Sequence, residues 1–184
     1  MRGADPWRYL EWLREETAPC GGSRAAGEAL EDSLVHPRLL IVGGAGCGKT
    51  TFLRQLAHLW CLGVQEARTY TLLFPIFVRL SELRAETGGD WLIDFLEARS
   101  RERNWGLDRE FFREKLGAAL AMLDGLDEAP WAARRIEEIA AASPQSRFVV
   151  TARPIGPAGA DGLAGFRTVN VGSVVPQLRG SVLI

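Results

Sequence analysis

One stretch constrains the fold of this chain more than any other: RLLIVGGAGCGKTT, at residues 38–51. It opens with a short apolar run, passes through the spacing G-x-x-x-x-G-K-T and continues into a helix-like pattern. That order of strand, glycine-rich turn and helix is typical of a phosphate-binding loop, or P-loop. We therefore expect phosphate to bind at Gly43, Gly44, Ala45, Gly46, Cys47, Gly48, Lys49, Thr50 and Thr51.

Each residue type in this loop has a chemical reason. Glycines let the backbone curl, so that several N–H groups face one anionic oxygen. The N-terminus of the following helix adds a partial positive charge at the same point. Lys49 can reach the β- and γ-phosphates of a nucleotide, and the Thr50 hydroxyl can hold Mg²⁺. Lys49 is one of only two lysines in a chain with 22 basic residues, which argues against a chance match.

The composition fits one globular domain with a real core. The chain has 184 residues, of which 47% are hydrophobic and 24% are charged. A net charge of −1 provides no global attraction to nucleic acid or to an anionic membrane. The sequence shows no membrane-length apolar run and no signal peptide, and its three cysteines are widely spaced. Together these features predict a reducing, cytoplasmic location.

Apolar segments alternate with helix-like segments along the chain, which predicts an α/β fold with a parallel sheet covered on both faces. Pro75 lies near the start of the second strand and predicts that this strand is at a sheet edge. The predicted strands are 38–42, 72–80, 118–123, 147–151 and 166–171. Helices are predicted from Asp5-Pro6, over 49–62, over 91–100, from Asp108 and over 131–142.

The apolar spacing also predicts which helix faces are buried. In the helix over 49–62, the expected buried stripe is Phe52, Leu53, Leu56, Leu59 and Trp60, with Arg54, Gln55 and His58 outward. For the aromatic N-terminal helix we favour packing on the main domain over a partner surface. The arginines at 99, 101 and 103 alternate with acids, so we expect a solvated helix end rather than a nucleic-acid contact.

Two further polar segments, DGLDE and TARP, follow the third and fourth strands, at the sheet edge where ligands bind. Asp124 ends an apolar strand and is placed to hold Mg²⁺ through water, the Walker B role; the alternative is an ordinary Asp-Gly turn. Asp127 or Glu128 could activate a water molecule, and we favour Asp127; alternatively, one of them caps the helix near Pro130. Arg153 could bind the γ-phosphate, or it could be a surface arginine paired with an acid.

Four segments together resemble the NACHT branch of the STAND nucleotide-binding switches, which occur in animal innate-immune receptors and in bacterial defence proteins. They are LLIVGGAGCGKTTFLRQLA, FPIFVRLSEL, LAMLDGLDEAP and RFVVTARP, and DGLDE is the most specific element. The resemblance covers about residues 36–155. It implies a P-loop NTPase three-layer sandwich with a parallel five-stranded sheet of order 5-1-4-3-2.

The resemblance also implies roles for individual residues. Gly43, Gly48, Lys49 and Thr50 would bind phosphate and Mg²⁺, Asp124 would be the Walker B acid, Asp127 and Glu128 its acidic extension, and Arg153 the sensor 1 residue. It further implies ATP as the nucleotide, ATP-dependent oligomerisation in the full-length protein, and control of an effector domain that this sequence does not identify.

These inferences divide the chain into a flanking helix and linker at 1–35, a core at 36–175 and a truncated tail at 176–184. We expect a fragment or isolated core, because related chains continue into a small helical domain and a winged helix. The expected function is a nucleotide-gated switch with slow Mg²⁺-dependent ATP hydrolysis. The alternatives are a kinase or other P-loop enzyme, an AAA+-like nucleic-acid motor, and a scaffold that binds nucleotide without hydrolysing it.

Overall fold

The computed structural model describes residues 5–18, 36–67, 73–84, 89–154 and 162–171. Five parallel strands form one sheet in the order β2-β3-β4-β1-β5. The strands are β1 (Arg38–Gly43), β2 (Phe74–Arg79), β3 (Ala119–Asp124), β4 (Arg147–Ala152) and β5 (Arg167–Val171). Read from the other edge, this order is 5-1-4-3-2, so the predicted fold class and topology are confirmed.

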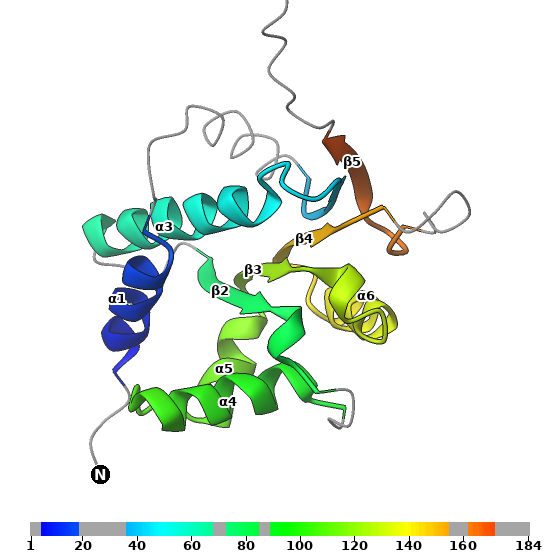
Figure 1. Ribbon diagram of the computed structural model, residues 1–184. Coiled ribbons are helices and arrows are strands. Elements are labelled where there is room, and N and C mark those ends of the chain that lie inside the picture. Colours follow the sequence, from blue (N-terminus) through cyan, green and yellow to red (C-terminus); the bar gives the residue numbers. More distant parts are fainter. Residues whose placement is uncertain (1–4, 19–35, 68–72, 85–88, 155–161, 172–184) are drawn as a thin grey trace, which may run out of the picture.

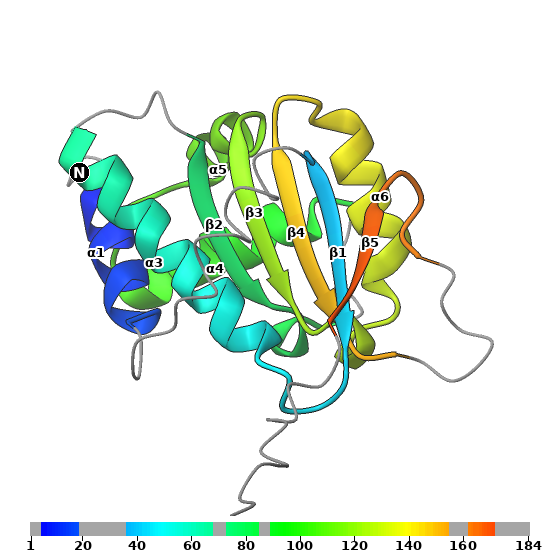
Figure 2. The same cartoon turned by 90° about the horizontal axis from the view of Figure 1, so that it is seen from above.

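Helices cover both faces of the sheet and complete the predicted three-layer sandwich (Figures 1 and 2). The helix α3 lies on one face, and α4, α5 and α6 lie on the other. The helices are α1 (Pro6–Glu16), α3 (Lys49–Ala67), α4 (Trp91–Arg103), α5 (Arg109–Leu116) and α6 (Ala132–Ala142), with short 3₁₀ turns η1 (Leu80–Glu82) and η2 (Leu126–Glu128). No helix within the described ranges has the length and apolar character needed to cross a membrane.

Burial along the strands follows their position in the sheet. All six residues of β3 are buried, because helices cover both faces of this interior strand. In contrast, β5 is an edge strand and is largely exposed. Because the strands are parallel, their carboxyl ends all lie at the same end of the sheet.

The N-terminal helix α1 packs on the main domain, as predicted, and the structure places it against the β2 edge of the sheet. Its residues Tyr9, Leu10 and Leu13 are buried, and the Tyr9 ring stacks on Phe74 of β2 at 5.3 Å between centroids. The Tyr9 hydroxyl donates a hydrogen bond of 2.9 Å to the carbonyl of Pro75. Pro75 lacks an N–H group, and β2 is indeed an edge strand. The docked helix α1 thus covers the β2 edge and satisfies one of its carbonyl groups.

The predicted buried stripe of α3 was partly wrong. Leu59 is 43% exposed and Gln55 is buried, while the buried apolar stripe consists of Leu53, Leu56, Ala57, Cys61 and Val64. The stripe is shifted because α3 contacts the sheet on one side and α1 on another. His58, expected to face outward, lies against α1, with its Nδ1 atom 3.1 Å from the carbonyl oxygen of Arg14. The helical spacing of apolar residues therefore predicted that α3 is a helix. Which face of α3 is buried depends also on its contact with α1.

Two predicted helix starts are confirmed by their caps. Asp5 accepts a hydrogen bond of 3.2 Å from the backbone N–H of Trp7 at the start of α1. Asp108 accepts one of 2.9 Å from the backbone N–H of Phe111 at the start of α5. In both helices, a short acidic side chain satisfies a donor that has no partner within the helix.

The arginines that end α4 have partners within the chain. Arg99 forms an ion pair with Glu82, and Arg101 forms one of 2.6 Å with Glu97. The guanidinium of Arg103 lies over the Trp12 ring, 5.6 Å from its centroid. These contacts fit the predicted solvated helix end.

Candidate phosphate-binding site

The loop between β1 and α3 has the tight backbone that its glycines predict. Gly46 and Gly48 have φ angles of +74° and +89°, a region that other residues rarely adopt. Gly43 is packed closely: a Cβ atom built there would lie 2.6 Å from Cys47 Sγ and 3.0 Å from the carbonyl oxygen of Val171. The glycine spacing is therefore required by the backbone geometry itself.

Lys49 holds its charge at the centre of this loop. Its ammonium group donates to the carbonyl oxygens of Gly43 at 2.6 Å and Gly44 at 2.9 Å. It also lies 3.5 Å from Cys47 Sγ, so the Cys47 side chain packs within the loop rather than apart from it. The ammonium group is thus a compact cation at the start of α3, where the N-terminus of the helix adds a partial positive charge.

Asp124 lies at the end of β3 and is held by a buried threonine. Its Oδ1 atom accepts a hydrogen bond of 2.6 Å from the Thr151 hydroxyl of β4. That hydroxyl in turn accepts one of 3.0 Å from the backbone N–H of Gly125. Gly125 has a φ angle of +84°, so the chain does turn after Asp124. This turn is compatible with a role for Asp124 in the candidate site. The hydroxyl of Thr50 and the carboxylate of Asp124 are oxygen donors of the kind that suits Mg²⁺.

The two acids that follow Asp124 differ in their surroundings. Asp127 Oδ1 accepts a hydrogen bond of 2.9 Å from the backbone N–H of Arg153, and its side chain is only 14% exposed. Glu128 is 47% exposed, and its Oε1 atom lies 3.6 Å from Arg153 Nη2. The Arg153 guanidinium also lies 3.4 Å from Asp127 Oδ2. Asp127 therefore fixes η2 to the end of β4, whereas Glu128 is the less constrained carboxylate.

Two alternatives from the sequence can now be compared with these contacts. Neither acid forms a capping hydrogen bond at the start of α6, whose N-cap residue is Trp131. Arg153 is paired with acids, as a surface arginine would be, but it also lines the cavity described next. The two readings of Arg153 are thus compatible.

One cavity of about 390 Å³ joins the three predicted segments, a size typical of small-molecule sites. It is lined by Ala45, Gly46, Gly48, Lys49, Thr50 and Thr51 of the loop, by Asp124, Gly125, Asp127 and Glu128, and by Thr151 and Arg153. Gly43, Gly44 and Cys47 belong to the loop but do not line the cavity.

The cavity lining also includes residues that sequence reasoning missed. Arg79 and Ser81, at and just after the end of β2, line it, and so does Thr151 of β4. A signal was available for each, because the carboxyl ends of parallel strands meet at one edge. Arg79 ends a predicted strand, and Thr151 lies within the TARP segment.

The sheet order, the glycine-rich loop after β1 and the acid at the end of β3 define a P-loop NTPase, a class that binds nucleotides. Residues 37–182 match the sequence profile of the NACHT domain. The chain therefore belongs to the NACHT domain family, as its motifs had indicated.

Comparisons with other proteins give more distant likenesses. The structure resembles AMPPCP-bound DnaA from Aquifex aeolicus with a TM-score of 0.43 and 15% identity, over 80% of this chain and 44% of that one. It resembles C. elegans PCH-2 with a TM-score of 0.43 and 13% identity, over 89% of this chain and 40% of that one. The chain spans less than half the length of either protein. No curated protein sequence matches it.

Proposed function

We propose that this chain is the ATP-binding core of a nucleotide-gated switch with slow, Mg²⁺-dependent ATP hydrolysis. The observation that carries the proposal is a single cavity in which a P-loop lysine, an oxygen-donor pair, two further acids and an arginine all meet. Membership of the NACHT family supports nucleotide binding. The choice of ATP over GTP, and the hydrolysis itself, belong to the proposal.

The phosphate groups would be bound by the loop and Lys49. Backbone N–H groups of the loop and the start of α3 supply donors, and Lys49 supplies a mobile charge. An ammonium group has three donors, so Lys49 can keep a loop carbonyl while it binds phosphate oxygens. Thr50 and Asp124 would hold Mg²⁺, which neutralises phosphate charge when bound.

For the attacking water, we propose Glu128 as the group that orients or deprotonates it. The sequence alone favoured Asp127, but Asp127 already accepts the backbone N–H of Arg153 and is the more buried of the two acids. Glu128 lines the same cavity and is more exposed. Arg153 would turn from these acids toward the γ-phosphate and stabilise the charge that develops there.

The wider biological role is a proposal that rests on the family. NACHT membership supports nucleotide-dependent self-association in a longer protein and a role in signalling or defence, with an effector whose identity the chain does not define. The net charge of −1 and the paired arginines of α4 weigh against a nucleic-acid motor.

Hydrolysis is tested by comparing Glu128→Gln with Asp127→Asn in steady-state ATP turnover and in ATP titration. We expect Glu128→Gln to keep ATP binding and to lose about a hundredfold in turnover, the lower range for general acid–base catalysis. Asp127→Asn keeps an oxygen that can accept the Arg153 N–H, so we expect a smaller loss.

Other outcomes separate the competing functions. Near-normal turnover in both variants would contradict the role of the acids. Binding without turnover in the unaltered protein would support the scaffold, and marked stimulation by nucleic acid would support the motor. Transfer of phosphate to an added small-molecule acceptor would support the kinase.

A further inference from the structure

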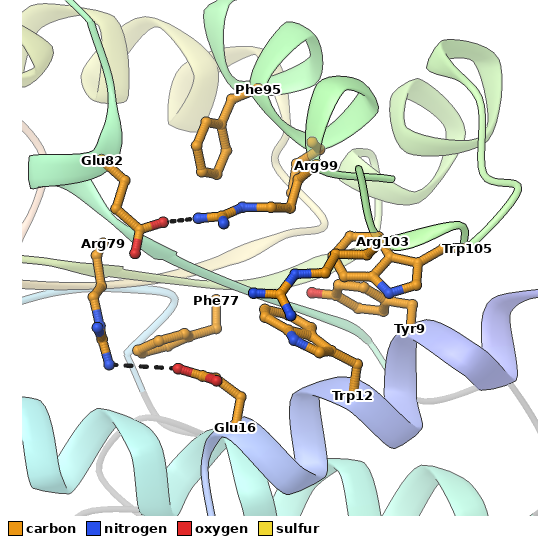
Figure 3. A pocket seen from close by; sticks show the side chains of 11 residues that line it. Tyr9, Trp12, Glu16, Phe77, Arg79, Glu82, Phe95, Arg99, Arg103 and Trp105 are labelled. Carbon is orange, nitrogen blue, oxygen red and sulfur yellow. Dashed lines mark hydrogen bonds and ion pairs between the residues drawn. The ribbon is translucent and has the colours of Figure 1, made fainter. Parts of the chain in front are cut away.

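Arg79 lies between two cavities and belongs to the lining of both. One is the phosphate cavity, and the other is a smaller cavity of about 50 Å³ between α1, β2 and α4 (Figure 3). Arg79 is also in register with Asp124 on the neighbouring strand β3. Its backbone is therefore one strand away from the proposed metal ligand, at the same height in the sheet.

In the smaller cavity, Arg79 is paired with the last residue of α1. Its Nη2 atom lies 3.6 Å from Glu16 Oε1, as the dashed line in Figure 3 shows. The carbonyl group of Glu16 also accepts a hydrogen bond from Arg54 of α3. The other ion pair drawn in Figure 3 joins Arg99 to Glu82. The end of α1 is thus linked to the edge of the phosphate cavity through one guanidinium group.

The link between Arg79 and Glu16 is weak enough to be exchanged. Both side chains are more than a third exposed, at 36% and 38%, and a pair of this kind contributes little in water. A phosphate group carries more charge and offers a planar guanidinium two oxygens at once, which makes a stronger contact. A nucleotide in the phosphate cavity would therefore compete with Glu16 for Arg79.

The strand order indicates which phosphate would compete. The P-loop follows β1, and β2 is the farthest strand from β1 on that side of the sheet, beyond β4 and β3. A phosphate chain held by the P-loop at one end would extend past Asp124 toward β2. In this direction the terminal phosphate of a triphosphate would come closest to Arg79, and a diphosphate would end earlier.

We propose that Arg79 is a γ-phosphate-binding residue that exchanges between Glu16 and a bound nucleoside triphosphate. The exchange releases the end of α1 from β2, so that α1 reports which nucleotide is bound. This inference rests on the proposed ATP site. Because such coupling is reciprocal, removing the Glu16 charge must strengthen triphosphate binding by the factor with which the pair now opposes it.

The test is a calorimetric titration of the whole chain with a non-hydrolysable ATP analogue and, separately, with ADP. We expect Arg79→Gln to weaken analogue binding about tenfold and to leave ADP binding unchanged, as for loss of one partly exposed charge-assisted contact. Glu16→Gln should strengthen analogue binding about two- to fivefold, the worth of an exposed pair.

Two charge-matched controls are available. Glu15→Gln removes an exposed acid from the same helix, and Arg134→Gln removes an arginine that is 88% exposed on α6. Neither should change the affinity for either nucleotide. Arg79→Lys keeps the cation and should lose less than Arg79→Gln, which guards against a variant that merely folds poorly.

Hydrogen–deuterium exchange of the α1 amides gives an independent readout. The analogue should raise exchange at the C-terminal end of α1 in the unaltered protein and in Glu15→Gln, and ADP should not. In Arg79→Gln the exchange should already be high and should not respond to nucleotide.

Three results would overturn the inference. If the unaltered protein binds the analogue but Arg79→Gln and Glu16→Gln change neither nucleotide affinity nor hydrogen–deuterium exchange of α1, the inference fails while the proposed function stands. Equal losses for the analogue and ADP would remove the γ-phosphate assignment. If the unaltered protein binds no nucleotide, the proposed function fails, and the inference fails with it.

Discussion

The hydroxyl of Thr151 should be essential both for stability and for Mg²⁺ affinity at the proposed metal site. It donates a hydrogen bond of 2.6 Å to Asp124 Oδ1 and accepts one of 3.0 Å from the N–H of Gly125. Thr151 is fully buried and Asp124 is 9% exposed, so both side chains are largely shielded from bulk water. Thr151→Val keeps the shape of the side chain and its preference for a strand, and it removes both hydrogen bonds.

The expected magnitude follows from those two bonds. A hydrogen bond to a charged group contributes roughly 1.5–3 kcal/mol, and a buried N–H left without a partner costs about 1–3 kcal/mol. Partial relaxation around Gly125 reduces the sum, so we expect Thr151→Val to lower the free energy of unfolding by about 2–4 kcal/mol. Loss of a group that orients a metal ligand typically lowers metal affinity about 10- to 100-fold.

The assay is urea denaturation together with a titration of the Mg²⁺ dependence of ATP binding. The control is Thr151→Ser, which keeps the hydroxyl and should lose stability only modestly while retaining most of the Mg²⁺ dependence. If Thr151→Val and Thr151→Ser behave alike in Mg²⁺ dependence, Thr151 does not position Asp124, and the reasoning from these hydrogen bonds is wrong.

Two further predictions concern the parts of the fold that support the site. Tyr9→Phe keeps the aromatic contact with Phe74 but removes the hydrogen bond that the Tyr9 hydroxyl donates to the Pro75 carbonyl. It should therefore lower the free energy of unfolding, measured by urea denaturation, by about 1–2 kcal/mol. An unchanged denaturation midpoint would contradict this hydrogen bond. The hydrogen bond and charge of Arg109, with those of Arg113, lower the pKa of Asp90 below its ordinary value. The ionised form is therefore favoured in the folded state, and its stabilising effect is present above the unfolded pKa and lost as the pH falls through the folded pKa. The stability gap between the unaltered protein and Asp90→Asn should accordingly be widest near neutral pH and close in acid, and a gap independent of pH would refute this.

The fold was predictable because its signals are local. The loop spacing, the apolar strands and the acidic caps at Asp5 and Asp108 each depend on a few neighbouring residues. The alternation of strands and helices adds only the general geometry of parallel sheets. The strand order itself came from the resemblance to the NACHT family, not from the residues.

What the sequence did not provide depends on which elements meet. Gln55 is buried, Leu59 is exposed and His58 lies against α1, and nothing within 49–62 encodes the position of that second helix. In the sequence, Arg79 is only a residue near the end of an apolar strand. The pairing of β2 with β3 places it beside Asp124. Similarly, Asp127 and Glu128 are adjacent in the chain, and they differ in exposure and in the contact that Asp127 makes with the Arg153 backbone just after β4. Such pairings need the tertiary structure.

The central claim is that this chain binds ATP through its P-loop, and Lys49→Ala tests it most directly. The ammonium group is the one charge at the centre of the loop, so ATP affinity measured by calorimetry with Mg²⁺ should fall at least about a hundredfold, roughly the loss of two charge-assisted hydrogen bonds. The matched control is Lys115→Ala, because Lys115 is the only other lysine and lies on α5 beside Glu114. That control should bind ATP normally. Unchanged ATP affinity in Lys49→Ala, or an equal loss in both variants, would contradict the account.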